Sequence, residues 1–336
     1  MTTRAPLAVS ATGIRKSYGA KVVLDGLDLA VPEGSIFALL GPNGAGKTTA
    51  VQILSTLISA DAGQIAVAGH DIAADPGAVR AAIGVTGQFS AVDGLLSGQE
   101  NLILMADLHH LGRAGGRRRA AALLAQFDLA EAAGKPAATY SGGMRRRLDL
   151  AMTLTGDPRV IFLDEPTTGL DPRSRRAKWQ IIRDLAARGV TIFLTTQQLD
   201  EADELADRIA VLDHGTVVAE GTPAELKRRI RGGHIQLHFT ARPELERAAC
   251  VLQTAGRDEE NLTLQVPGDG DPQTLRALLG TLERAAVAVD RLSIHTPDLD
   301  DVFFAFTGQP APAGQLPAAG QPGSADRPEA QKVSQS

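Results

Sequence analysis

The chain has 336 residues, enough for one large domain with an appendage or for two domains. Hydrophobic residues make up 43% of it and charged residues 22%, as in an ordinary globular protein. The formal net charge of -5 argues against a general affinity for nucleic acid, and no apolar run approaches the length of a membrane span.

Two further features bear on the cellular compartment. Residues 1–10 have no apolar core, so we expect no signal peptide there. Cys250 is the only cysteine, which excludes an intrachain disulfide and fits a reducing cytoplasm. We expect Cys250 to be a small buried apolar residue.

The chain opens with short strands. Residues 7–14 alternate loosely and predict a strand, and residues 22–31 predict two strands with a turn near Asp25-Gly26. Tyr18 lies between them. Its ring is suited to stack on an adenine base, although packing in the core is the default expectation for an aromatic side chain.

A glycine-rich motif, Gly-x4-Gly-Lys-Thr, follows the buried strand predicted at residues 34–40 and precedes a helix. Its residues are Gly41, Pro42, Asn43, Gly44, Ala45, Gly46, Lys47, Thr48 and Thr49. Glycines let backbone N–H groups approach phosphate oxygens, and the helix N-terminus adds unpaired donors. Lys47 is suited to reach the β- and γ-phosphates and the Thr48 hydroxyl to bind Mg²⁺, so the motif predicts a nucleotide site rather than a ligand-free turn.

Helical spacing dominates the next part of the chain. Residues 62–72 predict a hairpin, and residues 83–88 predict a strand ending in Gln88. Residues 89–157 are rich in Ala and Leu and predict a helical insert. The arginine runs at residues 117–119 and 145–147 are interpreted as solvated helix faces.

A second buried strand, at residues 159–163, ends in Asp164 and Glu165. In a P-loop protein such a strand lies beside the P-loop strand. Asp164 would then face Mg²⁺, directly or through water, and Glu165 would accept a proton from attacking water. Alone this pattern also fits a plain strand with an acidic turn, but its order after the P-loop strengthens the functional interpretation.

The remaining chain predicts further α/β structure and a boundary at residue 231. We expect helices at residues 178–188 and 199–205, a strand at 190–196, a hairpin at 208–221 with exposed His214 in its turn, and a helix from 223. Residues 231–308 predict a small accessory α+β domain, with strands at 235–240, 262–266 and 289–295 and helices at 273–285 and from Asp298 to Phe306. The accessory domain is either a regulatory binding module or a part that stabilises the assembly. Residues 309–336 predict a disordered tail.

Over residues 7–230 the chain resembles the ATP-binding subunit of an ABC transporter. The most specific match is Tyr140-Ser141-Gly142-Gly143-Met144, which is similar to the ABC signature Leu-Ser-Gly-Gly-Gln with both ends replaced. Ser141, Gly142 and Gly143 open a helix and form a second phosphate cradle. Two cradles on one chain suggest a head-to-tail homodimer, with each ATP between the P-loop of one copy and the signature of the other.

This resemblance implies an α/β fold: a P-loop NTPase ABC ATPase core over residues 1–230, with an antiparallel β subdomain and the helical insert. Tyr18 stands where the family stacks an aromatic ring on adenine. Gln88 stands where a glutamine senses Mg²⁺ and the attacking water, and Glu165 where the family has its general base. The segment Gly169-Leu170-Asp171 matches the loop that crosses the dimer interface.

One position departs from the family pattern. The switch histidine is replaced by Gln197, which is able to hydrogen-bond to a γ-phosphate but not to become cationic. Gln197 is therefore a candidate catalytic residue, beside Lys47, Gln88 and Glu165.

A narrower resemblance, to the daunorubicin-resistance type of ABC exporter ATPase, rests on residues 195–203 and 297–303. In that group a glutamine at the switch position is usual. The resemblance implies an ATPase that uses ATP and Mg²⁺ at the cytoplasmic face of the cell membrane. It would power efflux of an antibiotic or other amphiphilic compound, which a separate multi-span permease handles.

The alternative is a non-transport ABC ATPase that acts on nucleic acid or ribosomes. The acidic charge balance, the single P-loop and the lack of a coiled-coil insertion disfavour it, and we expect no nucleic-acid partner.

Overall fold

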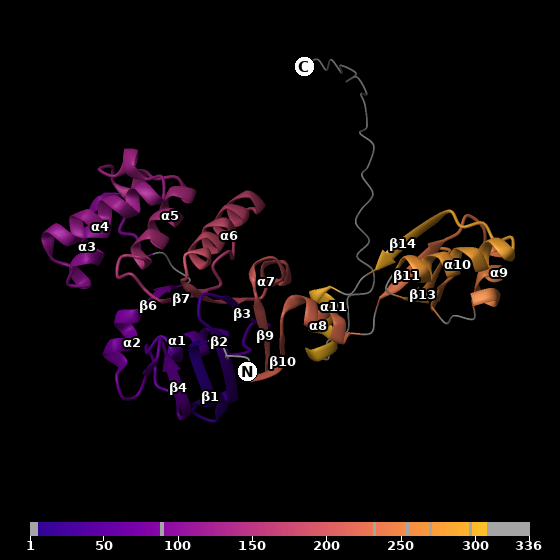
Figure 1. Cartoon of the computed structure of the whole chain (residues 1–336), viewed down its shortest axis with the longest axis horizontal. Coiled ribbons are helices and arrows are strands. Elements are labelled where there is room, and N and C mark those ends of the chain that lie inside the picture. The colour runs from indigo at the N-terminus through magenta and orange to yellow at the C-terminus, as the bar shows by residue number, and fades with distance from the viewer. Residues whose placement is uncertain are drawn as a thin grey trace, which may run out of the picture.

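The computed structural model describes residues 6–87, 91–230, 233–252, 256–268, 271–295 and 298–307. Gln88 and the predicted tail at residues 309–336 lie outside these described residues. Figure 1 shows a helical region above an antiparallel sheet on one side, and an accessory unit on the other.

The N-terminal strands form an antiparallel sheet with the spatial order β2-β1-β4-β5. Its members are β1 (Leu7–Tyr18), β2 (Lys21–Pro32), β4 (Ala62–Val67) and β5 (His70–Asp71). The predicted turn near Asp25-Gly26 is wrong, because residues 21–32 form a single strand. The register between β1 and β2 shifts beside Gly26, whose φ is 79°, so a bulge stands where we expected a turn.

A second sheet forms the centre of the molecule, with the order β10-β9-β3-β8-β7-β6. Its members are β3 (Ile36–Leu40), β6 (Ile83–Thr86), β7 (Val160–Asp164), β8 (Thr191–Thr196), β9 (Arg208–Asp213) and β10 (Thr216–Gly221). All neighbours pair in parallel except β9 and β10, which form the predicted hairpin with a 94% exposed His214 side chain in its turn. The prediction that the acidic strand lies beside the P-loop strand is wrong, because β8 lies between β7 and β3.

Successive side chains of the central strands enter two different cores. In β3, Ile36, Ala38 and Leu40 face a helical layer, whereas Phe37 and Leu39 face the antiparallel sheet and the first helix. Both faces of a parallel sheet are covered in this way, which explains why β3 is apolar throughout. The ends of these strands, which carry the polar site residues, are therefore held in place by side chains packed on both faces of the sheet.

The central part contains the predicted helices and one that we did not predict, α2. Their bounds are α1 (Lys47–Leu54), α2 (Pro76–Ala82), α3 (Gly98–Leu108), α4 (Gly112–Gln126), α5 (Gly142–Thr153), α6 (Pro172–Ala187), α7 (Leu199–Leu205) and α8 (Pro223–Arg229), with short turns η1 (Ala130–Ala132) and η2 (Ala137–Thr139). Helix α6 begins six residues before the predicted start at Lys178. Asp171 caps it by accepting hydrogen bonds from the N–H groups of Arg173 and Ser174, and Pro172 occupies its first turn.

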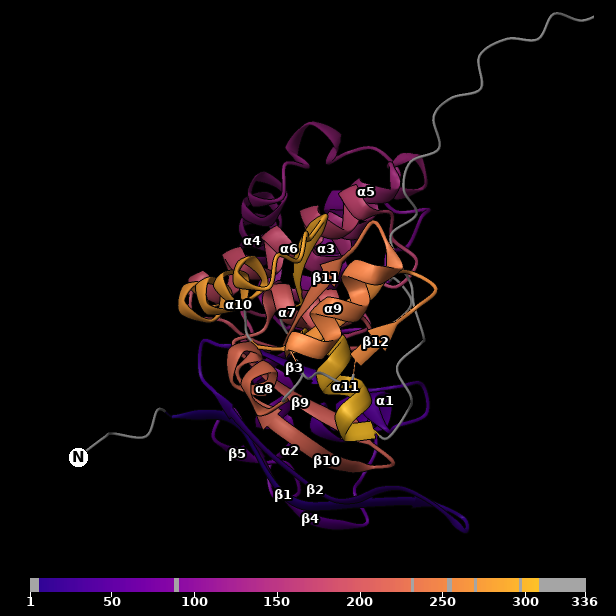
Figure 2. The ribbon, with the colours of Figure 1, turned by 90° about the vertical axis from the view of Figure 1, so that its right-hand side faces the viewer.

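The accessory unit has α+β structure, as predicted. It runs through β11 (His234–His238), α9 (Arg242–Leu252), β12 (Gly256–Asp258), β13 (Thr263–Pro267), α10 (Pro272–Arg284) and β14 (Arg291–His295). One helix and one strand of this unit, α9 and β12, we did not predict. Its strands pair antiparallel in the order β12-β13-β11-β14, the arrangement of a ferredoxin-like β-α-β-β-α-β unit. Figure 2 shows this unit from its outer side, with α9 and α10 in front of the sheet.

Cys250 in α9 is exposed, so the prediction of a buried cysteine is wrong. Leu245 and Ala248 turn the buried face of α9 toward the sheet. Cys250 lies two positions beyond Ala248, which is about 200° around a helix, and it therefore points to solvent.

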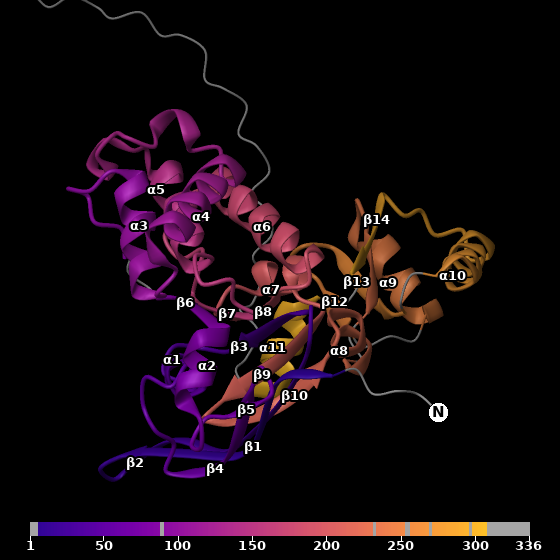
Figure 3. The ribbon, with the colours of Figure 1, turned by 60° about the vertical axis from the view of Figure 1, so that its left-hand side comes forward.

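The last described helix, α11 (Leu299–Thr307), leaves the accessory unit and packs beside α7, α8 and β10. Leu299 and Val302 are 2% and 0% exposed in the same core as the helical face of the central sheet. Figure 3 shows α11 against β9 and β10 rather than against the accessory sheet. The domain boundary near residue 230 stays a prediction. Within the described parts of the chain, no helix combines the length and the apolar character needed to cross a membrane.

Candidate nucleotide site

The predicted phosphate loop connects β3 to α1 and depends on close packing around its glycines. A Cβ atom at Gly41 would lie 2.3 Å from the carbonyl oxygen of Leu212 in β9, so any larger residue would push the loop off the sheet. Gly46, at the start of α1, has a φ of 110°, a conformation that favours glycine. The sequence therefore permits a tight turn that presents backbone N–H groups at a helix N-terminus.

Lys47 is 4% exposed and points back into this loop. Its Nζ donates to the carbonyl oxygens of Gly41 (2.9 Å) and Pro42 (3.1 Å) and lies 3.5 Å from Glu165 Oε1. Burial lowers the pKa of Lys47, and the negative charges of Glu165 and Asp164 oppose that shift. A buried ammonium with a single close carboxylate partner is well placed to bind an incoming phosphate group.

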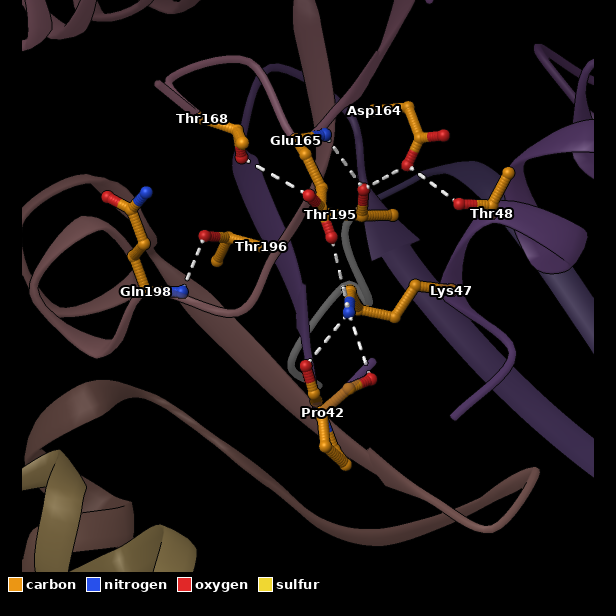
Figure 4. A network of polar contacts seen from close by, with 10 residues as sticks. Pro42, Lys47, Thr48, Asp164, Glu165, Thr168, Thr195, Thr196 and Gln198 are labelled. Atoms are coloured by element: carbon orange, nitrogen blue, oxygen red, sulfur yellow. Dashed lines mark hydrogen bonds and ion pairs between the residues drawn. The ribbon is translucent and has the colours of Figure 1, made fainter. Parts of the chain in front are cut away.

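The two carboxylates of the acidic strand meet the P-loop, as the sequence predicted (Figure 4). Thr48 Oγ1 lies 3.4 Å from Asp164 Oδ1, so a hydroxyl and a carboxylate oxygen are adjacent. The Thr195 hydroxyl in β8 donates to the same Asp164 oxygen at 2.5 Å and accepts from the N–H of Glu165 at 3.1 Å. Thr195 thus hydrogen-bonds to both acidic residues. It lies beside them because β8 pairs with β7 in a register that sets Thr195 opposite Asp164.

Glu165 has an unusual backbone conformation. Its φ of 47° lies in the left-handed region, which costs of order 1–3 kcal/mol for a residue other than glycine. Its Oε2 accepts a hydrogen bond from Thr168 Oγ1 at 3.2 Å, and its Oε1 faces Lys47. The surrounding contacts maintain this strained position, which turns the carboxylate toward the phosphate loop.

The signature segment opens α5. Ser141 caps this helix by accepting a hydrogen bond from the N–H of Met144. A Cβ atom at Gly142 or Gly143 would meet nothing within 4 Å, so both backbones lie open. Tyr140, at the position where the family usually has leucine, is 4% exposed and its hydroxyl donates to the carbonyl oxygen of Ala132 at 2.7 Å. The replacement therefore ties the signature to the helical region.

The signature does not join the P-loop within one chain. Among the described residues, no hydrogen bond or ion pair connects Ser141, Gly142 or Gly143 to the P-loop. The views in Figures 1 and 3 agree that α5 and α1 lie apart. Ser141 and Gly143 instead line a groove of about 660 Å³ between α5 and α6. The two cradles therefore do not form one site within a single chain.

Three other predicted site residues have different outcomes. Tyr18 is 51% exposed at the end of β1, with the Lys16 ammonium 5.6 Å from its ring centre, so the default expectation of core packing is wrong. Gln197 is exposed directly after β8. Gln88 lies outside the described residues.

Thr195 and the buried Glu201 in α7 were not predicted from the sequence. The only sequence signal for Thr195 was that its strand ends in two hydroxyl residues. This signal points to a site only when it is known that the strand pairs with the acidic strand. The signal for Glu201 was its helical spacing with Leu205, which placed a carboxylate on the apolar face of α7.

Comparison with known proteins agrees with this geometry. Residues 24–168 match a family model described as ABC transporter. Over 306 residues the chain is 48% identical to the daunorubicin resistance ATP-binding protein DrrA2 of Streptomyces coeruleorubidus, covering 90% of this chain and 95% of that protein. The chain belongs to the ABC transporter ATP-binding family. The predicted ATPase activity of an ATP-binding cassette and the predicted fold are thereby confirmed.

This ATP-binding cassette also resembles exporter subunits of other kinds and solved structures. It is 37% identical over 303 residues to the Nod factor export ATP-binding protein I of Rhizobium sp. (strain N33), covering 90% of this chain and 98% of that protein. The structure of an ATP-binding subunit of an ABC transporter matches with a TM-score of 0.59 and 28% identity, over 67% of this chain and 93% of that chain. A dimeric ATP-binding cassette in a post-hydrolysis state, bound to ADP and Pi, matches with a TM-score of 0.57 and 25% identity, over 64% of this chain and 98% of that chain.

Proposed function

We propose that this ATP-binding cassette powers efflux of an antibiotic or other amphiphilic compound through a separate multi-span membrane subunit, at the cytoplasmic face of the cell membrane. The names of the daunorubicin-resistance and Nod factor export relatives support export as the direction of transport. The higher identity to the daunorubicin-resistance protein favours a drug-like compound over a Nod factor.

The observation that carries the ATPase assignment is the convergence of Lys47, Thr48, Asp164 and Glu165 at one edge of the central sheet. The Thr48 hydroxyl and Asp164 carboxylate supply adjacent hard oxygen atoms, a set that fits Mg²⁺. We propose that these residues hold the ion, together with Gln88. When bound, Mg²⁺ neutralises charge on the phosphates. Lys47 binds the β- and γ-phosphates, and the exposed Tyr18 ring stacks on adenine.

Glu165 acts as the general base. Its carboxylate accepts the proton of the attacking water while Lys47 is drawn toward the γ-phosphate. Gln197 contributes a neutral hydrogen bond beside the γ-phosphate. Because glutamine does not become cationic, Gln197 orients the phosphate and the water without adding charge.

The second cradle serves another copy of the chain. Ser141, Gly142 and Gly143 are exposed and open, and they make no polar contact with the P-loop among the described residues of their own chain. In the proposed homodimer each ATP lies between the P-loop of one copy and the signature of the other. The loop Gly169-Leu170-Asp171 crosses the interface. The similarity to a dimeric cassette supports this arrangement.

The membrane subunit is proposed to contact the helical region. Leu95 and Leu108 are 88% and 64% exposed, and Leu104 is 46% exposed on the same helix, α3, as Leu108. Leu104 and Leu108 are four residues apart and so share one face of α3, and an exposed apolar face indicates an interaction site. Affinity purification of the chain from detergent-solubilised native membranes is expected to recover a multi-span protein in roughly equal amount. Recovery from the soluble fraction with ribosomes or nucleic acid would overturn the transport assignment.

The ATPase mechanism is tested by Glu165→Gln, which keeps the size of the side chain but removes the base. We expect this variant to bind ATP, to lose turnover in a phosphate-release assay by at least about 100-fold, and to accumulate as an ATP-bound dimer in gel filtration. Glu131→Gln is the matched control, because Glu131 is an exposed carboxylate in η1. Undiminished phosphate release by Glu165→Gln would refute the role of Glu165.

A further inference from the structure

A buried carboxylate lies outside the nucleotide-binding residues. Glu201 in α7 is 1% exposed, and its Oε1 accepts two hydrogen bonds, from Thr167 Oγ1 at 2.8 Å and from Trp179 Nε1 at 3.1 Å. Thr167 is fully buried, and Trp179 is 8% exposed. One oxygen of Glu201 therefore joins α7 to α6 and to the turn that follows Glu165.

Hydrogen bonds hold each of the three residues of this turn, Pro166, Thr167 and Thr168, which follow the proposed catalytic base. The Lys178 ammonium donates to the carbonyl oxygen of Pro166 at 2.6 Å. Thr167 donates to Glu201, and Thr168 donates to Glu165 Oε2 at 3.2 Å. Because Glu165 itself has a left-handed backbone, these contacts are what keep its carboxylate in place.

Glu201 also lies close in the chain to Gln197, because α7 begins two residues after Gln197. Burial raises the pKa of Glu201, while hydrogen bonds from Thr196, Thr167 and Trp179 and the charge of Lys178 oppose that shift. Thr196 precedes Gln197, and its hydroxyl accepts a hydrogen bond from the N–H of Gln198 at 2.9 Å. The Glu201 carboxylate thus joins the turn of the base to the helix that follows Gln197.

Stability alone is a weak explanation for such a group. A buried carboxylate loses its hydration, and apolar residues of similar size often serve stability as well or better. Glu201 nonetheless lies on the apolar face of α7, next to Ala202 and Leu205. One of its hydrogen-bond partners, Thr167, belongs to the turn that follows Glu165, which indicates a role in catalysis.

We propose that Glu201 is a positioning residue for ATP hydrolysis: through Thr167 it fixes the turn that aims Glu165, and it joins this turn to α7, the helix that follows Gln197. The inference rests on the proposed function of Glu165 as general base. It predicts that the link between Glu201 and Thr167 affects the rate of hydrolysis and not the binding of ATP, because neither residue contacts the P-loop among the described residues.

Thr167→Val tests this link, because it removes the hydroxyl with little change in shape. Trp179→Phe is the matched control, since it removes the other hydrogen bond to the same Glu201 oxygen without touching the turn. We expect Thr167→Val to lower kcat for ATP roughly 10- to 100-fold with KM and nucleotide affinity within about twofold. Trp179→Phe is expected to keep kcat within about threefold of the wild type.

Two variants of Glu201 extend the test. Glu201→Gln keeps an acceptor oxygen for Thr167 and Trp179 and should retain most of the activity. Glu201→Ala should lose kcat as Thr167→Val does, and thermal melting of the full chain checks that each variant is folded. An unchanged kcat in Thr167→Val, or equal losses in Thr167→Val and Trp179→Phe, would overturn the inference.

The outcomes separate this inference from the proposed function. If the wild type hydrolyses ATP, Glu165→Gln does not, and Thr167→Val behaves as the wild type, then Glu165 remains the base and only the positioning role fails. If Glu165→Gln hydrolyses ATP as fast as the wild type, the proposed function of Glu165 fails, and the positioning role of Glu201 is overturned with it.

Discussion

Replacing Thr195 by valine removes one hydroxyl group and leaves the packing of β8 nearly unchanged. Thr195 is fully buried, donates to Asp164 Oδ1 at 2.5 Å and accepts from the N–H of Glu165 at 3.1 Å. A hydrogen bond to a charged group contributes about 1.5–3 kcal/mol to the free energy of unfolding. Thr195→Val should therefore lower the folding equilibrium constant by roughly 10- to 150-fold. It should also lower kcat, because the Asp164 carboxylate and the backbone of Glu165 both lose the group that holds them.

Thr195→Ser is the informative partner of this variant. It keeps the hydroxyl but loses a buried methyl group, which costs about 1 kcal/mol. Urea unfolding without nucleotide measures both stability losses, and phosphate release at saturating Mg²⁺ and ATP measures kcat. We expect the serine variant to keep most of its turnover and the valine variant to lose at least about tenfold. If the valine variant hydrolyses ATP as well as the serine variant does, the hydroxyl does not hold Asp164 and Glu165 for catalysis and the reasoning is refuted.

Two further predictions concern Lys47 and α11. Because burial lowers the pKa of Lys47 below 10.5, the unfolded chain holds this proton at pH values where the folded, nucleotide-free chain has lost it. The unfolding free energy of the wild type should then rise relative to that of Lys47→Met as pH approaches 10.5 from below. Urea titrations over this pH range measure both free energies. A difference between the two proteins that does not change with pH would contradict the prediction. In α11, Leu299→Ala should lower the unfolding free energy by about 2–5 kcal/mol in the same assay, because Leu299 is buried. Ala305→Ser, at an exposed position, should change it by no more than about 0.5 kcal/mol. Equal losses in the two variants would mean that α11 is not packed in solution.

Local motifs made part of the site predictable. The P-loop carries its chemistry in one continuous run, where glycine spacing and the following helix are visible in the sequence. Asp164 and Glu165 were predictable because they end an apolar strand. The partnership of Asp164 with Thr195 was not, because it depends on the register between two parallel strands that are 31 residues apart in the chain.

The errors in the fold prediction have similar causes. The apolar alternation of residues 21–32 is interrupted at Gly26, and only pairing with β1 shows that the interruption is a bulge. The start of α6 was missed because Asp171 was interpreted only as part of a functional loop, although it is also an N-cap. When a residue such as Asp171 has two roles, a prediction that gives it only one role misses the other.

The packing of α11 makes the ATPase body discontinuous in sequence. Residues before 231 and residues 299–307 share one core, so the accessory unit is inserted into that body and is tethered to it at both ends. Truncating the chain after residue 295 would strip a buried helix from the body and leave the accessory unit held by a single connection. Excising residues 233–295 with a short linker would leave the body whole. An internal deletion is therefore the operation that separates what the accessory unit does from what the ATPase body needs in order to fold.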